Sequence, residues 1–485
     1  MKQSKASLTD YQILREAIGS LRPGAAHQAN YPPNPDEIFT PVTHASALDP
    51  QRSLVIGNRG VGKSFWSSVL THNAAREKVA IAYPRIPLTQ IRAALGFHEA
   101  AGKDDGPAPS PAILAQLRQL GHRPETIWRA VLIAALKTEI SEQIPASIKD
   151  IIAWMEADIE RTEAALRRAD NSFASRKQTF LIVFDALDRL GGNWEDITPL
   201  TQGVLRLALD MRGFRAMKAK VFMRTDQSKD DSLFRFADAS KIRAEAVNLV
   251  WRRGELFGLL YSYLLRDGVA QAALSRLAGF GETQRLGDEL LGDEELQEQL
   301  FYRLAGEYMG AGPKRGRTYN WLYDHLADTF GETSPRSFIT ALQRAANFGP
   351  APKELVIDHN GIRAGVQDAS SVRVAQLKED YIWIQKVLSA LDGLAVPCDP
   401  SAFKRRWVER GTISALQLDA QNETGLLPLE FANKPVVPEE ALLRALGNIG
   451  VIEFRTESRI NMPDIFRVGA GIKRKGGVRP PSRRT

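Results

Sequence analysis

The sequence has very little that could build a disulfide, a zinc site or a membrane anchor. Cys398 is the single cysteine among 485 residues, so no intramolecular disulfide can form. The seven histidines are scattered without the spacing of a zinc site. No apolar run approaches the roughly 18 residues that a membrane helix needs, and the N-terminus lacks the apolar region of a signal peptide. We therefore expect a cytoplasmic protein with no membrane partner and no structural metal beyond Mg²⁺.

Charge of either sign is balanced except at one end of the chain. The formal net charge is +7, and residues 465–485 contain seven basic residues and no acidic one. These are Arg467, Lys473, Arg474, Lys475, Arg479, Arg483 and Arg484. A basic end interrupted by glycine and proline can contact nucleic-acid phosphates, or it can serve solubility alone. The sequence leaves both interpretations open.

A phosphate-binding pattern stands at residues 53–66, SLVIGNRGVGKSFW. It fits G-x-x-x-x-G-K-[ST], with an apolar strand before it and a helix-compatible run after it. Its glycines allow backbone N–H groups to surround a polyphosphate, since no Cβ intervenes. Lys63 is predicted to reach the β- and γ-phosphates, and the Ser64 hydroxyl to bind Mg²⁺. The alternative is an ordinary glycine turn.

The pattern therefore predicts ATP and Mg²⁺ as cofactors. The expected nucleotide-binding residues are Gly57, Asn58, Arg59, Gly60, Val61, Gly62, Lys63, Ser64 and Phe65.

A second motif follows about 120 residues later, where FLIVFD at 180–185 is a continuous apolar run that ends in an aspartate. A buried parallel strand delivers such a carboxylate to its C-terminal edge, which is typical of a Walker B strand. Asp185 is predicted to bind Mg²⁺ opposite Ser64, and Asp188 lies at the start of the following turn. The alternative is a core strand followed by a helix-capping aspartate.

Further strands are predicted at 79–83, at 219–226 and at 244–251. With the two motif strands they give five parallel strands and an α/β fold. Residues 99–112 are typical of an exposed linker, and helices are expected at about 124–142 and 146–170. This helical insertion, at about 99–175, interrupts the regular alternation of strands and helices.

The order of these motifs resembles the AAA+ and STAND (KAP-like) branch of P-loop ATPases over roughly residues 50–347. In that branch the fourth strand ends in a sensor 1 residue, which Arg224 or Thr225 matches here. The resemblance also implies a sensor 2 arginine at the start of a lid helix. Arg336 fits it, because Pro335 suits the first helical position. A solvent-facing or capping arginine is the alternative for Arg336.

One departure from this family concerns the residue that polarises the attacking water. AAA+ proteins follow the Mg²⁺ aspartate with a glutamate, and this chain has Ala186 there. Asp188 is then the candidate base, although it could instead pair with Arg189 or cap a helix. The resemblance implies an arginine finger from a neighbouring subunit. Arg243, Arg252 and Arg253 are its candidates, and the predicted catalytic residues are Lys63, Asp185, Asp188, Arg224 and Arg336.

The C-terminal third is predicted to be helical at 368–392 and 399–410. A helix, a strand, a turn and a second strand then follow, which resembles a winged-helix domain. The expected domains are an N-terminal segment packing on the ATPase core (1–50), the P-loop core (51–250), a helical lid (251–350), a helical and winged-helix-like region (351–472) and a basic tail (473–485).

The favoured interpretation is an ATP-binding and ATP-hydrolysing molecular switch that controls self-assembly or a protein effector. Many bacterial ATPases that it resembles act in antiviral defence, so the resemblance implies that context. A DNA-dependent motor or loader, with DNA binding through the winged-helix region and basic tail, is the first alternative. A scaffold that holds nucleotide without hydrolysing it is the second.

Overall fold

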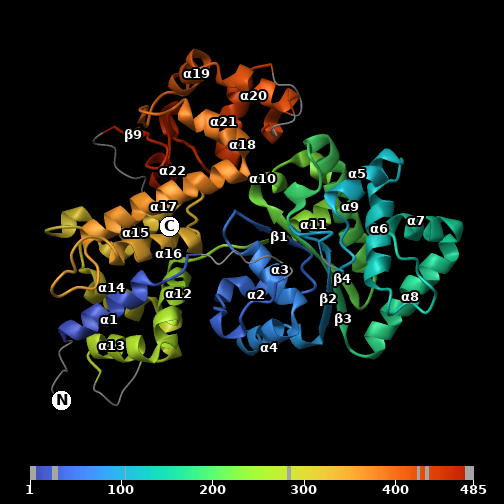
Figure 1. Ribbon diagram of the computed structural model, residues 1–485, viewed down its shortest axis with the longest axis horizontal. Helices are drawn as coiled ribbons and strands as arrows, with labels where there is room; N and C mark the ends of the chain where they lie inside the picture. Colours follow the sequence, from blue (N-terminus) through green and yellow to red (C-terminus); the bar gives the residue numbers. More distant parts are fainter. Residues whose placement is uncertain are drawn as a thin grey trace. The chain divides into compact units, whose positions relative to one another are not determined.

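The computed structural model describes residues 7–23, 31–103, 105–280, 286–422, 427–431 and 436–475. They form two compact units (Figure 1). We call the described residues between 26 and 250 the sheet unit, and those before 26 and after 250 the helical unit. No helix in these ranges has both the length and the apolar composition to cross a membrane.

The sheet unit is built on five parallel strands, which confirms the predicted fold class. Their order across the sheet is β2-β3-β4-β1-β5, and each neighbouring pair runs parallel. The residues of β3 and β4 are buried almost throughout, as expected of parallel strands covered by helices. The strands are β1 (Leu54–Gly57), β2 (Ile91–Phe97), β3 (Thr179–Phe184), β4 (Met217–Arg224) and β5 (Val247–Asn248).

The strand order brings the two sequence motifs to one edge of the sheet. β4 lies between β1 and β3. Gly57 at the end of β1 is in register with Arg224 at the end of β4, and Phe184 of β3 is in register with Val221. The phosphate loop, Arg224 and the residue after Phe184 therefore leave the sheet at the same carboxyl edge.

The strand predicted at residues 79–83 is wrong. These residues end the helix α4 (Asn73–Ala82) and the turn after it. Ala75 and Val79 are buried four residues apart, whereas Ile81 is 79% exposed, which is the period of a helix. The alanines of the segment favour a helix as well. The strand that follows is β2, which begins only at Ile91.

The helices of the predicted insertion follow β2 and precede β3 in the chain, and they pack on the sheet. The Trp128 ring lies edge-on to Phe97 of β2 and Phe184 of β3, and its indole N–H donates to the Leu200 carbonyl (2.8 Å). The insertion therefore helps to build the core instead of only decorating it. The helices are α5 (Pro111–Gln119), α6 (Pro124–Ala135), α7 (Ile148–Ala157) and α8 (Ile159–Ser175), and α9 (Trp194–Asp210) follows β3.

The described residues among the first 50 are divided between the two units, although the sequence suggested that all 50 pack on the ATPase core. In the sheet unit, the Tyr83 hydroxyl donates to the Pro41 carbonyl (2.5 Å) and binds the proline-rich segment to α4. Helix α1 (Leu8–Gly19) belongs to the helical unit, where Arg276 donates to Asp10 at 2.9 and 2.6 Å. Its neighbours are α13 (Gly268–Ala278) and α16 (Pro335–Ala346).

The rest of the helical unit begins with an aromatic cluster. The Phe257 and Tyr319 rings stack at 3.9 Å between centroids, and Phe338 lies edge-on to Phe257 at 4.9 Å. The long helix α17 then lies against α16 at Gly361 and Gly365, where a Cβ would come within 2.7 and 2.1 Å of α16 carbonyl oxygens. The helices are α12 (Arg253–Arg266), α14 (Glu294–Ala305), α15 (Thr318–Leu326) and α17 (His359–Asp380).

The C-terminal part contains an antiparallel hairpin, β7 with β8, as the sequence suggested. Cys398 adds a short antiparallel bridge to Ile460 of β8, with N–H···O distances of 3.0 and 2.7 Å. The elements are α18 (Ile382–Ser389), β6 (Ala395–Val396), α19 (Pro400–Glu409), α20 (Thr412–Gln421), α21 (Pro438–Asn448), β7 (Glu453–Phe454), β8 (Ile460–Asn461), α22 (Asp464–Arg467) and β9 (Lys473–Arg474). Residues 476–485 of the basic tail lie outside the described residues.

Asp170 of α8 gives a test of how the insertion is joined to the sheet. Its carboxylate is 6% exposed and accepts the backbone N–H groups of Arg215 (3.0 Å), Ala216 (2.7 Å) and Met217 (3.1 Å). An unsatisfied buried N–H costs about 1–3 kcal/mol. We therefore expect Asp170→Ala to lower the free energy of unfolding by about 3 kcal/mol, measured by urea denaturation. Arg167→Ala, exposed on the same helix, is the control, and equal midpoints for the two variants would contradict the expectation.

Candidate functional site

The loop between β1 and α3 (Lys63–Thr71) has the backbone that glycine alone supplies easily. Gly60 and Gly62 have φ of 81° and 107°, in the left-handed region. A Cβ on Gly57 would lie 2.8 Å from Val61 Cγ2, so the start of the loop is closely packed as well. The three glycines singled out in the sequence are thus the ones that this loop conformation requires.

Lys63 lies at the first position of α3 and turns back over the loop. Its ammonium donates to the carbonyls of Gly57 (2.8 Å) and Asn58 (2.9 Å). Burial lowers the pKa of Lys63 to about 8, although the nearby Asp185 opposes the shift. A bound phosphate would offer this amine a charged acceptor in place of two neutral carbonyls.

Asp185 follows β3 directly and is 2% exposed. Burial raises the pKa of Asp185, while the hydroxyl of Ser64, which is hydrogen-bonded to it, favours the carboxylate. Its Oδ2 is buried without a hydrogen-bond partner among the described residues. A hydroxyl and a carboxylate with an unused oxygen are hard ligands that suit Mg²⁺, which keeps several of its waters. The residues present therefore fit the predicted ion.

Asp188 lies in the short helical turn η4 (Leu187–Arg189) and is held by two arginines. Arg59 of the loop approaches its Oδ2 at 2.5 Å, and Arg224 approaches the same oxygen at 3.1 Å. Burial favours the neutral acid, but the charges of Arg224 and Arg59 outweigh it and lower the pKa of Asp188 to about 2. In this arrangement Asp188 is a weak base. The alternative pairing with Arg189 is wrong, since Arg189 pairs with Glu99 at 2.6 Å.

Arg224 ends β4, which lies between the strand that leads into the loop and the strand that leads to Asp185. Its role as sensor 1 stays a prediction. Asp226 holds its guanidinium at 2.9 and 2.5 Å. Sequence reasoning missed Asp226, although an acidic residue two positions after a strand-ending arginine was a signal that could have identified it. It also missed that Arg59 reaches Asp188. Thr225, the other candidate, begins the short helix α10 (Thr225–Ser228).

Behind the loop, a buried chain of hydrogen bonds fixes α3. The Trp66 indole N–H donates to His44 Nδ1 (2.9 Å), so His44 carries its proton on Nε2 and donates it to the Val250 carbonyl (3.0 Å). Phe65, a predicted nucleotide contact, lies edge-on to Trp66 with centroids 5.0 Å apart. These contacts hold the helix whose N-terminus faces the loop.

The roles of the remaining arginines stay predictions. Arg336 is in the helical unit on α16, next to Pro335 at the start of the helix, as the sequence suggested. Among the finger candidates, Arg243 pairs with Asp231 (2.8 Å). Arg253 pairs with Glu294 (3.4 Å). The structure thus brings together Lys63, Ser64, Asp185, Asp188 and Arg224, and leaves the roles of the other arginines as predictions.

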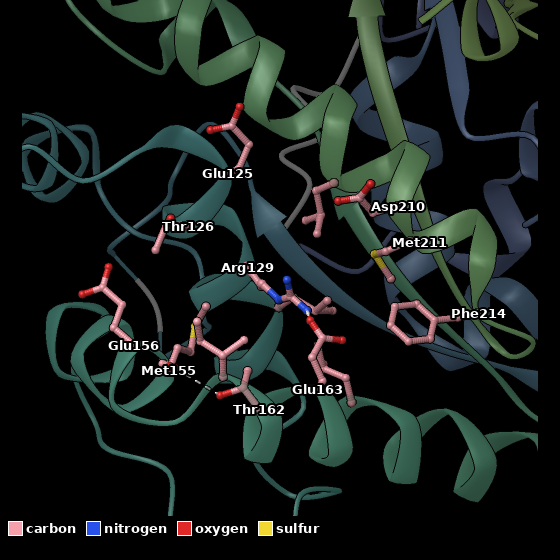
Figure 2. Close-up of a pocket in the computed structure, with 14 residues that line it drawn as sticks. Glu125, Thr126, Arg129, Met155, Glu156, Thr162, Glu163, Asp210, Met211 and Phe214 are labelled. Carbon is pink, nitrogen blue, oxygen red and sulfur yellow. Dashed lines mark hydrogen bonds and ion pairs between the residues drawn. The ribbon is translucent and has the colours of Figure 1, made fainter. Parts of the chain in front are cut away.

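A pocket of about 470 Å³ lies in the insertion of the same unit, and its lining includes no residue of the phosphate loop. Figure 2 shows the Arg129 side chain directed at Glu163, with which it forms an ion pair. Three more carboxylates line the pocket, Glu125, Glu156 and Asp210. Burial raises the pKa of Asp210, and Glu125 and Glu163 add to the rise. The carboxylates that line this pocket disfavour a polyphosphate, so the phosphate loop remains the candidate nucleotide site.

Within the parts of the chain that the structure describes, no group of three or more His, Cys, Asp or Glu side chains is arranged to hold a metal ion. The Ser64 and Asp185 oxygens are therefore the candidate cation ligands that the geometry offers.

No family model matches the chain, and no curated protein matches it. Among solved structures, it is similar to a Walker-type ATPase of Pyrococcus abyssi, with a TM-score of 0.41 and 12% identity over 93% of this chain and 98% of that chain. It is similar to the ORC2 protein of Aeropyrum pernix in ADPNP–ADP complexes (TM-score 0.38, 12% identity, 90% and 93% coverage) and in its ADP form (0.30, 13%, 93% and 93%). Similarity at this level does not assign the chain to a family.

Proposed function

We propose that the protein is an ATP-binding molecular switch that hydrolyses ATP slowly to ADP and phosphate. One observation carries the proposal. A glycine loop places Lys63 and Ser64 beside the buried Asp185, whose Oδ2 has no hydrogen-bond partner among the described residues. Backbone N–H groups, an ammonium and a pair of hard oxygen ligands together suit a nucleotide polyphosphate with its magnesium ion.

Each residue of the site then has a defined task. Lys63 binds the β- and γ-phosphates, and the start of α3 directs its dipole at the same charge. Ser64 and Asp185 would hold Mg²⁺, which supplies charge neutralisation at the phosphate oxygens when it is bound. Arg224, fixed by Asp226, lies one strand from the loop at the edge where the terminal phosphate is expected.

Slow turnover follows from the state of the candidate base. Asp188 shares one oxygen with two guanidinium groups, and its pKa of about 2 makes it a poor proton acceptor. Ala186, where the resemblance expects a glutamate, has only a methyl group and a φ of 56°. A site that binds nucleotide well and orients water poorly suits a switch better than a motor.

The partner of the switch is proposed from the C-terminal part. The bridge from Cys398 to β8 and the β7–β8 hairpin support a winged-helix-like arrangement in which α21 precedes the hairpin. The first turn of α21 has Glu439 and Glu440, and Lys404 pairs with Glu440. Two carboxylates at the start of this helix disfavour phosphate contact. We therefore favour self-assembly or a protein effector as the output.

A DNA-dependent ATPase is the second candidate, and a specific observation favours it. Lys473, Arg474 and Lys475 are exposed at the end of the described chain, where β9 pairs with β6. Backbone bonds from Lys473 to Leu394 (2.8 Å) and from Lys475 to Val396 (2.7 Å) hold this segment in place. A fixed basic segment at the start of the tail can position nucleic acid without reading its sequence.

Lys63→Ala tests the nucleotide site itself. Loss of the ammonium removes charge-assisted hydrogen bonds worth about 1.5–3 kcal/mol each, so we expect the affinity for Mg·ATP to fall about 10–100-fold or more. Isothermal titration calorimetry measures it. Lys78, a half-exposed lysine on α4 that pairs with Asp36, gives the matched control: Lys78→Ala should bind as the unmodified protein does. Unchanged affinity in Lys63→Ala would remove the basis of the proposal.

Asp185→Asn separates the metal role from a structural one. Because burial raises the pKa of Asp185, its charge disfavours folding at neutral pH, and the amide should leave the ligand-free melting temperature equal or higher. We expect Mg²⁺ to stop strengthening ATP binding in this variant, and hydrolysis to be impaired. Titrations with and without Mg²⁺ measure the first effect. A Mg²⁺ dependence that survives would mean that the strand end is only part of the core.

Truncation of the basic tail decides between the two partners. Removing residues 476–485 and changing Lys473 and Lys475 to Gln keeps the backbone of β9 while deleting basic charge. If the tail contacts phosphates, DNA affinity should fall for every sequence alike, and the slope of log affinity against log salt should lessen by about 0.9 per lost contact. ATP turnover without DNA should not change. Identical DNA affinities and slopes would favour a protein partner.

A further inference from the structure

The carboxylate of Asp188 lies between two arginines that are restrained very differently. Arg224 has a side chain only 6% exposed, and Asp226 holds its guanidinium with hydrogen bonds of 2.9 and 2.5 Å. Arg59 belongs to the glycine loop, directly before Gly60 with its left-handed backbone, and its side chain is 22% exposed. Arg224 is therefore held in place at the end of β4, and Arg59 is the more exposed of the two arginines and the better able to exchange its partner.

Both cations of the loop are satisfied by the protein's own acceptors. Lys63 donates to two loop carbonyls, and Arg59 donates to the Asp188 carboxylate. A polyphosphate entering the loop would compete for both groups. The β-phosphate, present in ADP and in ATP, suffices to compete for Lys63. Arg59 points to the Asp188 side, so a third phosphate is the ligand group best suited to draw it away.

We propose that Arg59 makes the site respond to ATP over ADP, by leaving Asp188 for the γ-phosphate. The inference rests on the proposed nucleotide function and adds a role that the glycine pattern does not assign, since the pattern accepts any residue at this position. Arg59 has two states, one on the carboxylate without a γ-phosphate and one on the phosphate with it.

The exchange is energetically balanced because Asp188 keeps a second partner. Removing the only cation from a buried carboxylate is strongly unfavourable, but Arg224 remains 3.1 Å from the same oxygen. Arginine binds phosphate with two parallel hydrogen bonds, which makes the γ-phosphate a stronger acceptor than a carboxylate shared with another arginine. The Arg59 ion pair therefore breaks at low cost and only for a suitable ligand.

The same exchange links binding to the candidate base. With both arginines in place the pKa of Asp188 is about 2, and the loss of one positive charge raises it. Asp188 thus becomes a better acceptor for a hydrogen bond from water only after the γ-phosphate has taken Arg59. Arg224 still holds the same carboxylate oxygen at that point, so Asp188 stays a weak base and turnover stays slow. Without ATP, the Asp188 carboxylate stays ion-paired with both arginines.

Arg59→Gln tests the proposal by calorimetric titration of Mg·ATP and Mg·ADP into the full-length protein. We expect the ATP affinity to fall about 10–100-fold, the loss of charge-assisted hydrogen bonds, while the ADP affinity stays within about threefold. Arg189→Gln is the control, because Arg189 follows Asp188 directly in the chain, is half-exposed and pairs with Glu99 instead. Its affinities for both nucleotides should match those of the unmodified protein.

The opposing outcomes are distinct. If Arg59 only braces the loop, Arg59→Gln loses affinity for ATP and ADP alike, or for neither, and the proposal is overturned. If the unmodified protein binds neither nucleotide, the proposed function fails first and the role of Arg59 with it. A second variant, Arg59→Lys, keeps the charge without the bidentate fork and should recover part of the ATP preference. In ligand-free Arg59→Gln, NMR titration should show a higher pKa for Asp188 than in the unmodified protein.

Discussion

The candidate site depends on one constraint, the parallel register that ends β1, β3 and β4 at the same edge of the sheet. Gly57 and Asp185 are more than a hundred residues apart in the chain, and β4 between their strands adds Arg224 to the same edge. The strands are buried, so a shift of register would move apolar side chains out of their packing. The packing of the apolar strands therefore fixes where Asp185 and Arg224 lie at the end of the sheet.

Two buried polar connections stiffen this frame around the loop. Lys220 of β4 is fully buried and donates to the carbonyls of Asp49 (2.6 Å) and Arg52, which precede β1. Burial lowers the pKa of Lys220 to about 7, with Asp49 opposing. On the other side, Trp66 and His44 join α3 to the end of the sheet unit. The segments before and after the glycine loop are thus held in place, so we expect a ligand to move the side chains of the loop more than its flanking segments.

The sequence predicted the local parts of the site and failed where contacts are remote. A glycine loop and an apolar strand ending in aspartate are encoded in short continuous segments, so the Lys63 loop and Asp185 could be located. The strand at 79–83 was wrong because apolar residues rich in alanine suit either period over so short a run. The pairing of Arg59 with Asp188 joins residues 129 apart, and no local pattern encodes it.

Lys63, Asp188 and Arg224 of the candidate site are already paired with protein groups, and this pairing decides what kind of ligand can change their contacts. Lys63 and Asp188 each already have protein partners, so a ligand gains only the difference between its own contacts and those that it replaces. Two ligands that share all but one phosphate can shift a conformational equilibrium differently only through the contacts of that phosphate. Under the proposed function, those contacts lie at the carboxyl edge beside β4, where a buried arginine and a loop arginine share one carboxylate oxygen. In the exchange that we propose, the sheet holds Arg224 in place, and the loop supplies the charge whose partner depends on the ligand.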